Sequence, residues 1–388
     1  MVSEPNSKLQ KADMDNAIKR AIIQTDKAIH DLGKNFKAAA SMNGIYPPGQ
    51  LKSWTEGFYT GELWLVYEWT KNERYAEVAK KHVEMLKYRI QNHIHTNHHD
   101  MGFLYSPSCV AAYKLCRFEA GREAALLAAD NLINRFQEKG SFIQAWGELG
   151  EKDNYRMIID CLINLPLLYW ATEETKDAKY KTYASRHIET ALKYIMREDS
   201  STYHTYFFDN LTGEPLYGVT HQGYRDDSAW ARGQAWGIYG VALSYRYLRK
   251  EEYITIFKRI TDYFIEHLPE DLVPFWDFDF TDGSAEPRDS STAAIAVCGM
   301  LEMMKYLPEQ EVRYYGDMAE RILLSLIHNY SVKDTDHSNG QLLHGTYSKS
   351  SPYNTCPDNG VDECNAWGDY YYLEALMRIK NPKWKMYW

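Results

Sequence analysis

The chain has 388 residues, and its 44 basic and 53 acidic side chains give a formal net charge of −9 at pH 7. Proteins that bind nucleic acid gather Lys and Arg on one surface or segment, so the lack of any basic run here argues against such a partner. No apolar stretch is long enough to cross a bilayer, and we therefore expect no membrane partner.

The start of the chain and its cysteines bear on its compartment. Residues Met1 to Lys8 contain no apolar segment of the kind found in secretory signals. The six cysteines are scattered and form no C-x-x-C pair, so they indicate neither a zinc ribbon nor a disulfide framework. We therefore expect a cytoplasmic protein.

Apolar residues recur at helical spacing along most of the chain, and strand signals are few. The pattern predicts an all-α fold of about twelve helices. They lie near residues 14–33, 56–70, 72–93, 105–117, 120–137, 155–171, 177–197, 228–247, 251–268, 290–306, 309–331 and 366–379.

The links between these helices alternate between short and long. The long links follow the odd-numbered helices and span residues 34–55, 94–104, 138–154, 198–227, 269–289 and 332–365. Because short links produce antiparallel hairpins, we expect a closed double ring of hairpins with the long loops at one end. An open solenoid is the alternative, although no fixed-period repeat supports it. No linker separates domains, so residues 1–388 are predicted to form a single domain.

The connection at 198–227 carries the clearest β signal. Residues 202–208 are aromatic and β-branched, residues 209–213 have the composition of a turn, and residues 214–220 return. We expect a small β-hairpin standing on the loop side of the helices.

Asp160 is a single carboxylate in the apolar run 154–168, whose spacing predicts a buried helix. A buried carboxyl must be paired, hydrogen-bonded or protonated. Burial also raises its pKa, as a general acid at neutral pH requires. The alternative is a structural Asp160 bonded to the backbone or to Arg156, and this run alone favours neither reading.

Trp, His, Gly and Asp recur in the long loops and at the helix starts that follow them. Such a set describes a pocket that stacks a sugar ring, and paired carboxylates are the usual equipment for glycoside cleavage. Taken singly, each Trp is more typical of a core. The segments are Ser53–Gly61, His98–Tyr105, Gln144–Gly147, Asp160, His204, Thr220–Gly223, Trp230–Gly237 and Asn365–Tyr370.

Arg232 lies in an aromatic helical stretch, where a buried guanidinium needs an anion. One candidate is a protein carboxylate such as Asp226 or Asp227, which would make Arg232 structural. The other is a substrate carboxylate, which Arg binds through paired hydrogen bonds.

A histidine-rich turn raises the question of a metal. His93, His95, His98, His99 and Asp100 include the ligand types that zinc prefers. Their spacing matches no zinc motif such as H-E-x-x-H, so we predict no metal. We expect His99 to orient Asp100 or to cap the following helix.

Several of these segments together resemble the unsaturated glucuronyl hydrolases of bacterial glycosaminoglycan breakdown. The resemblance implies an (α/α)6 barrel, in agreement with the helix count, and an enzyme that requires no metal or organic cofactor. The matching segments run in order over nearly the whole chain: His99–Ser106, Ile143–Gly147, Ile158–Leu168, Tyr203–Thr205, Thr220–Gly223, Arg232–Gly240 and Trp367–Leu376.

The resemblance also implies a substrate, a glycosaminoglycan fragment with a Δ4,5-unsaturated uronic acid at its non-reducing end, and a reaction. The C4=C5 vinyl ether is hydrated, and the resulting hemiketal opens and expels the remaining sugar. Asp160 matches the general acid and base of the family, and Asp100 matches a second carboxylate that acts as nucleophile or stabiliser. Positions that hold the unsaturated uronate or line its pocket match Gly218, Thr220, Arg232, Trp236, His204, Gln222, Trp54 and Trp146.

One loop departs from the family pattern. Members that prefer sulfated substrates carry Ser-x-x-Ser-x-Lys before the last helix. Here Ser348 and Ser351 are present and are predicted to contact substrate, whereas Tyr353 stands where Lys is expected. Lys349 is a candidate replacement for that charge, and the preferred sulfation is left open.

Three other functions are compatible with parts of the sequence. A hydrolase of unsaturated rhamnogalacturonan fragments from pectin would share the chemistry, although segments 144–147 and 232–237 favour the glucuronyl hydrolases. A non-catalytic, carbohydrate-binding α/α toroid would not need paired carboxylates. A sugar epimerase would use His204 and His221 for proton transfer. The sequence indicates no oligomeric state.

Overall fold

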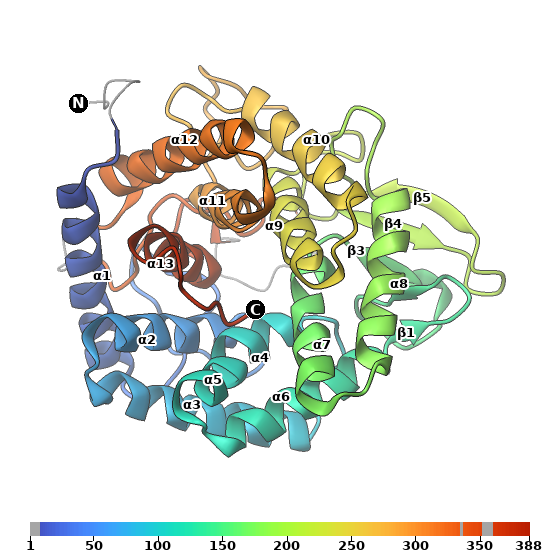
Figure 1. Cartoon of the computed structure of the whole chain (residues 1–388), viewed down its shortest axis with the longest axis horizontal. Coiled ribbons are helices and arrows are strands. Elements are labelled where there is room, and N and C mark those ends of the chain that lie inside the picture. Colours follow the sequence, from blue (N-terminus) through green and yellow to red (C-terminus); the bar gives the residue numbers. More distant parts are fainter. Residues whose placement is uncertain (1–7, 334–336, 351–359) are drawn as a thin grey trace.

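The computed structural model describes residues 8–333, 337–350 and 360–388, most of which are helical (Figure 1). This confirms the mostly helical fold class. A π-helical turn at Ser106–Val110 joins α4 to α5, so these two short helices together form the predicted fourth helix. The helices are α1 (Lys11–Leu32), α2 (Glu56–Thr70), α3 (Glu73–Gln91), α4 (Met101–Tyr105), α5 (Ala111–Cys116), α6 (Glu119–Ile133), α7 (Cys161–Thr175), α8 (Lys179–Tyr194), α9 (Ala231–Leu248), α10 (Glu252–Glu266), α11 (Ser290–Met303), α12 (Glu309–Ser325) and α13 (Ala366–Lys380).

The helices pack in two layers around a common centre. Helices α2, α4, α7, α9, α11 and α13 contact one another in that order, and α13 packs against α2, which returns the circuit to its start. Helices α1, α3, α6, α8, α10 and α12 lie outside them (Figure 1). Inner helices are buried on nearly every face, as in α9, where residues Ala231 to Tyr245 are all buried. Outer helices such as α10 bury one face only, as surface helices do.

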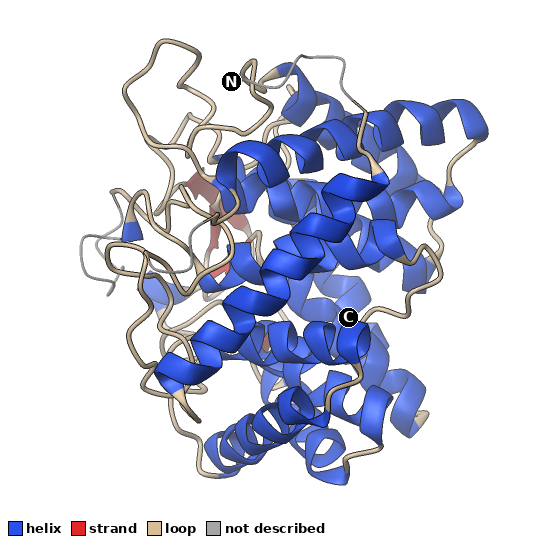
Figure 2. Cartoon of the chain, turned by 90° about the vertical axis from the view of Figure 1, so that its left-hand side faces the viewer, coloured by secondary structure: helices blue, strands red, loops and turns tan. Residues whose placement is uncertain are grey.

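The long connections collect at one end of the molecule. Figure 2 shows loops and strands on one side of the helices, with the end marked C on the other. This arrangement agrees with the alternation of short and long links in the sequence, and it allows side chains from different loops to meet. Within the described ranges, no helix combines the length and apolar character that crossing a membrane requires.

Short strands lie among these loops. The predicted hairpin is present as two antiparallel strands, and a third strand extends it into a sheet of order β3-β4-β5. A separate pair, β1 and β2, was not predicted. The strands are β1 (Phe136–Gln137), β2 (Phe142–Ile143), β3 (Arg156–Ile158), β4 (Thr205–Phe208) and β5 (Pro215–Val219).

The predicted helix at 155–171 is wrong at its start. Residues Arg156 to Ile158 form β3, which pairs with β4 so that Met157 lies opposite Tyr206. Helix α7 begins only at Cys161. Pairing with a distant strand overrides the helical periodicity of this short segment. Asp160 therefore lies at the junction of a strand and a helix.

A buried ion cluster ties the first long connection to the inner helices. The Lys37 ammonium donates to Glu62 on α2 at 2.9 Å and to Asp369 on α13 at 2.8 Å, and all three side chains are fully buried. The rings of Tyr46 and Tyr59 lie 4.7 Å and 5.1 Å from the ammonium. Two carboxylates thus depend on one cation where water cannot replace it.

We expect Lys37→Met to lower the free energy of unfolding by about 3–5 kcal/mol, the usual effect of removing one partner from a buried ion pair. Lys380→Met is the matched control, because Lys380 pairs with Asp15 at 2.6 Å on the surface. Surface pairs contribute about 1 kcal/mol or less. Denaturant unfolding followed by circular dichroism measures both variants, and equal losses would contradict a structural role for the cluster.

Candidate active site

A cavity of about 280 Å³ lies among the long connections. Both predicted catalytic carboxylates are on its wall, together with predicted substrate-binding residues from several separate loops. His99 and His221, from two of the segments predicted to form the pocket, also line it, as does Tyr347, which the sequence did not single out. The full lining is Trp54, His99, Asp100, Trp146, Asp160, His204, His221, Gln222, Tyr347 and Ser348.

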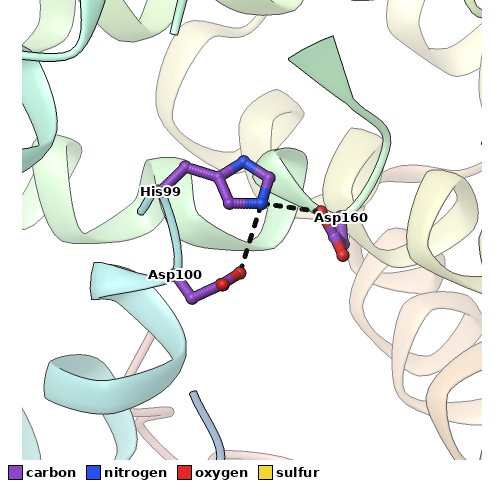
Figure 3. A group of neighbouring side chains, drawn as sticks. All are labelled: His99, Asp100 and Asp160. Carbon is purple, nitrogen blue, oxygen red and sulfur yellow. Dashed lines mark ion pairs between the residues drawn. The ribbon is translucent and has the colours of Figure 1, made fainter. Parts of the chain in front are cut away.

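Asp100 and Asp160 each stand immediately before an inner helix. Asp100 precedes α4, and Asp160 precedes α7. The His99 imidazole lies between them (Figure 3), with Nε2 3.3 Å from Oδ1 of Asp100 and 3.2 Å from Oδ1 of Asp160. The sequence associated His99 with Asp100 alone, whereas the structure places it in contact with both carboxylates.

The close approach of α4 to α7 brings these carboxylates together. A Cβ atom on Gly102 would lie 2.4 Å from Cα of Asn164, so only glycine fits there. The Asn164 side chain accepts a hydrogen bond from the Phe103 amide at 2.8 Å and donates one to the Asp160 carbonyl at 3.2 Å. Asn164 thereby fastens the two helix starts to each other. Sequence reasoning gave it no role, although a single amide in an apolar run was a usable signal.

The environment drives the two carboxyl pKa values apart. Burial raises the pKa of Asp160 well above its ordinary value, and the charge of Asp100 raises it further, against a smaller opposing effect of Arg232. Burial also acts on Asp100, but interactions with His99 and His98 outweigh it and lower the pKa of Asp100. Burial lowers the pKa of His99 to about 4. These shifts favour a protonated Asp160 beside an ionised Asp100 and a neutral His99.

The histidine-rich turn contributes one residue to a convergent group. Within residues 8–333, 337–350 and 360–388, His99, Asp100 and Asp160 are the one set of three candidate metal ligands, with atoms within 4.8 Å of one another. His98 instead accepts the Asp100 amide at 3.1 Å and donates to the His95 carbonyl at 3.0 Å. A divalent cation at this place would compete with the proton that the raised pKa of Asp160 favours. The lack of a metal stays a prediction.

The carboxylate that pairs with Arg232 is Asp289, directly before α11. Both side chains are buried, at 1% and 0% exposure. The expectation of Asp226 or Asp227 was wrong, since both of these residues are exposed in the loop before α9. Proximity along the chain does not reveal a partner that arrives from another loop.

Arg232 also holds two parts of the cavity wall. Its guanidinium donates to Oε1 of Gln222 at 2.9 Å and to the carbonyl of Tyr347. A further hydrogen bond reaches the carbonyl of Thr346 at 2.6 Å. Arg232 is not itself among the lining residues, so in this structure it acts on the cavity through Gln222 and Tyr347.

His204 presents a neutral donor. Its Nδ1 accepts the His221 amide at 3.1 Å and lies 2.8 Å from the Thr205 hydroxyl, so the proton belongs on Nε2. Nε2 has no hydrogen-bond partner among the described residues. Burial lowers the pKa of His204 well below its ordinary value, which keeps the ring uncharged.

The predicted binding residues Gly218, Thr220 and Trp236 are not among the residues that line the cavity. Gly218 is on β5, and Thr220 follows that strand. Trp236 is buried in α9 against Phe103, with ring centroids 5.1 Å apart. Ser351 falls outside the described residues. The substrate contacts that the resemblance implies for these four positions stay predictions.

The chain is similar to known proteins over nearly its whole length. The model of Glycosyl Hydrolase Family 88 matches residues 24–361. The unsaturated chondroitin disaccharide hydrolase of Streptococcus agalactiae is 48% identical over 382 residues, which are 98% of this chain and 94% of that protein. Sequence similarity of this extent leaves no large segment unmatched.

Solved structures agree with these matches. The unsaturated glucuronyl hydrolase of Streptococcus agalactiae is similar with a TM-score of 0.95 at 47% identity, over 100% of this chain and 98% of that chain. A variant of that enzyme in complex with dGlcA-GalNAc6S is similar with a TM-score of 0.87 at 43% identity, over 100% of this chain and 97% of that chain.

A helical scaffold with paired carboxylates in a loop-end cavity, matched in this way, defines a glycosidase. The chain belongs to glycosyl hydrolase family 88, among the unsaturated glucuronyl hydrolases. The resemblance seen in the sequence is confirmed. Membership of this family argues against the two alternative functions, a non-catalytic carbohydrate-binding toroid and a sugar epimerase.

We expect Gly102→Ala to lower kcat by about 100-fold, because a methyl group there pushes α4 from α7 and separates Asp100 from Asp160. Gly237→Ala on α9 is the matched control, since its Cβ would make only an ordinary contact, 3.4 Å from Ile159. Steady-state kinetics and thermal unfolding measure both variants. A Gly102→Ala enzyme with the wild-type kcat would contradict this account of the site.

Proposed function

We propose that the enzyme releases Δ4,5-unsaturated uronic acid from the non-reducing end of glycosaminoglycan oligosaccharides left by polysaccharide lyases. The observation that carries the proposal is the pair of Asp160 and Asp100 on the cavity wall, where burial raises the pKa of Asp160 and interactions with His99 and His98 lower that of Asp100. The dGlcA-GalNAc6S bound by the Streptococcus agalactiae relative supports this substrate class over pectin-derived fragments.

In the proposed reaction Asp160 protonates C4 of the C4=C5 bond, and positive charge develops over C5 and the ring oxygen. Water then bonds to C5 and returns a proton to the Asp160 carboxylate. The resulting hemiketal opens to a ketone at C5, and the remaining sugar leaves C1 as an alcohol. One water is consumed and no redox change occurs. Protonating carbon requires an acid of raised pKa, which burial gives Asp160.

Asp100 stabilises the positive charge that develops in this step. Its proximity to Asp160, with one oxygen of each within 4.8 Å of the other, supports a coupled pair that holds a single proton. His99 contacts both groups, and its lowered pKa favours the neutral ring. A neutral ring adds no positive charge that would favour loss of the proton from Asp160. The pair therefore supplies an acid and an anion at one place.

Neutral donors hold the unsaturated uronate in this proposal. The side-chain oxygen of Gln222 accepts a hydrogen bond from Arg232. The amide N–H groups of Gln222 are then left to donate to substrate. His204 offers Nε2–H. Trp54 and Trp146 line the cavity as ring surfaces for the sugar.

The loop that begins at Ser348 and differs from the family pattern bears on whether the substrate must be sulfated. Ser348 lines the cavity, whereas the ammonium of Lys349 forms an ion pair with Glu286. Ser351 and Tyr353 fall outside the described residues. Because the charge of Lys349 is already matched by Glu286, we propose that the enzyme turns over unsulfated disaccharides without a requirement for sulfate.

We also propose that the two layers form an (α/α)6 barrel and that residues 1–388 are one catalytic domain. The circuit of inner helices from α2 to α13 supports the barrel. The cytoplasmic location is likewise a proposal, with which the free thiols of Cys109, Cys116, Cys161, Cys298 and Cys364 agree.

Ultraviolet absorbance of the C4=C5 bond tests the proposed function. Wild-type enzyme is expected to remove the absorbance of unsaturated chondroitin or heparin disaccharides, including unsulfated ones. Asp160→Asn should lower kcat by about 100- to 10,000-fold, because an amide does not donate the proton. Asp153→Asn, an exposed carboxyl in the same connection, is the control. Turnover of pectin-derived fragments alone would favour the alternative substrate, and an active Asp160→Asn would remove Asp160 from the mechanism.

The value of kcat/KM should pass through a maximum with pH and fall at both higher and lower pH. As pH rises through the raised pKa of Asp160, the proton donor is lost. As pH falls through the lowered pKa of Asp100, the stabilising anion is lost. Initial rates over the range where circular dichroism shows an intact fold measure both limbs. Activity that keeps rising on the alkaline side would contradict a protonated Asp160.

A further inference from the structure

A second hollow adjoins the active-site cavity. Its volume is about 690 Å³, against about 280 Å³ for the cavity, and the two share Trp54, Asp100 and Tyr347. Its other lining comes mainly from the first long connection, so we call it the 38–53 groove. Neither the sequence nor the family resemblance assigned a role to residues 38–52. Those that line it are Ala38, Ala39, Ala40, Met42, Pro47, Pro48, Gly49, Gln50, Lys52 and Ser53.

Hydrogen bonds and a buried ion cluster hold the chain that forms the 38–53 groove. The turn at 42–45 is held by Glu363, whose carboxylate accepts the amides of Asn43 at 2.6 Å and Gly44 at 3.0 Å. The buried Lys37 cluster anchors the start of the same connection. A preformed surface loses little conformational entropy when a ligand binds.

The groove continues from the place where the reaction occurs. If the unsaturated ring occupies the cavity, the sugars attached to it must pass out of the cavity wall. The 38–53 groove begins on that wall, at Trp54 and Tyr347. Its volume falls within the roughly 300–1,000 Å³ of typical ligand sites, whereas the cavity alone is slightly smaller than that range.

Lys52 gives this groove a positive charge. Its backbone amide donates to Glu56 at 2.9 Å, which fixes its position, while its side chain is exposed. Glu56 is paired with Arg89 at 3.0 Å, so its charge is already matched. No residue of the described chain forms an ion pair or hydrogen bond with the Lys52 ammonium. In a chain of net charge −9, an unpaired cation beside the cavity is a local site for an anion.

We infer that the 38–53 groove binds the sugars on the reducing side of the cleaved bond, and that Lys52 pairs with the carboxylate of an internal uronate. This inference rests on the proposed function. Glycosaminoglycans alternate uronate and hexosamine, so an unsaturated tetrasaccharide carries an internal uronate that the disaccharide lacks. Met42, whose side chain is 44% exposed in the groove, offers apolar surface for the intervening ring.

The test compares unsulfated unsaturated disaccharide and tetrasaccharide, so that the carboxylate is the only added anion. Wild-type enzyme should show a KM for the tetrasaccharide lower by up to about fivefold, as one exposed ion pair allows. Lys52→Gln should remove most of that difference and leave disaccharide kinetics unchanged. Lys52→Arg should restore it. Added salt should weaken the tetrasaccharide preference of the wild type, because exposed charges are screened.

Lys383→Gln is the matched control, because Lys383 is exposed and lines neither the groove nor the cavity. A second variant tests the groove without touching charge. Ala38→Phe places a ring on the groove wall and should raise KM for the tetrasaccharide alone. Thermal unfolding verifies that each variant is folded.

The outcomes separate this inference from the proposed function. Equal KM values for the two substrates, or a tetrasaccharide preference that Ala38→Phe leaves intact, would overturn the groove while disaccharide turnover upheld the reaction. A wild-type enzyme that turns over neither substrate would overturn the proposed function itself. A tetrasaccharide preference that survives Lys52→Gln but is lost in Ala38→Phe would overturn the assignment of Lys52.

Discussion

The site depends on the contact between the starts of α4 and α7. Gly102 packs on the backbone of Asn164 at a distance that no side chain permits, and Asn164 bonds to both helix starts. Asp100 and Asp160 are the residues directly before these two helices, so the helix contact fixes the distance between them. Placing both groups on helix starts gives a precision that flexible loops do not provide. Since the charge of Asp100 raises the pKa of Asp160, the packing of the two helices affects the protonation of the site.

The walls around this pair are held by groups that do not face the cavity. Arg232 fastens Gln222 and the Tyr347 backbone, which arrive from different loops. Lys37 anchors the first connection to two inner helices. Buried ion pairs of this kind add little net stability compared with apolar packing, but each is lost at high cost if one partner is removed. They therefore specify where the loops lie, which is what a preorganised site requires.

The helices were predictable because inner segments are apolar throughout and outer segments alternate with helical period. Asp160 was predictable as a carboxylate in an apolar run. What failed depended on contacts between distant parts of the chain. β3 forms because β4, about fifty residues later, pairs with it, and Arg232 meets Asp289 from another loop. Asn164 was as visible as Asp160, but its role exists only where α4 reaches α7.

The pairing of Arg232 with Asp289 also explains how Asp160 can keep its proton near a guanidinium. Arg232 acts to lower the pKa of Asp160, and an unpaired cation at that place would stabilise the carboxylate and remove its proton. Asp289 offsets that charge within the buried pair. The donors left for a substrate carboxylate are then neutral ones, Gln222 and His204. Neutral donors bind an anion without favouring deprotonation of the neighbouring acid. The same arrangement therefore serves both substrate binding and proton transfer.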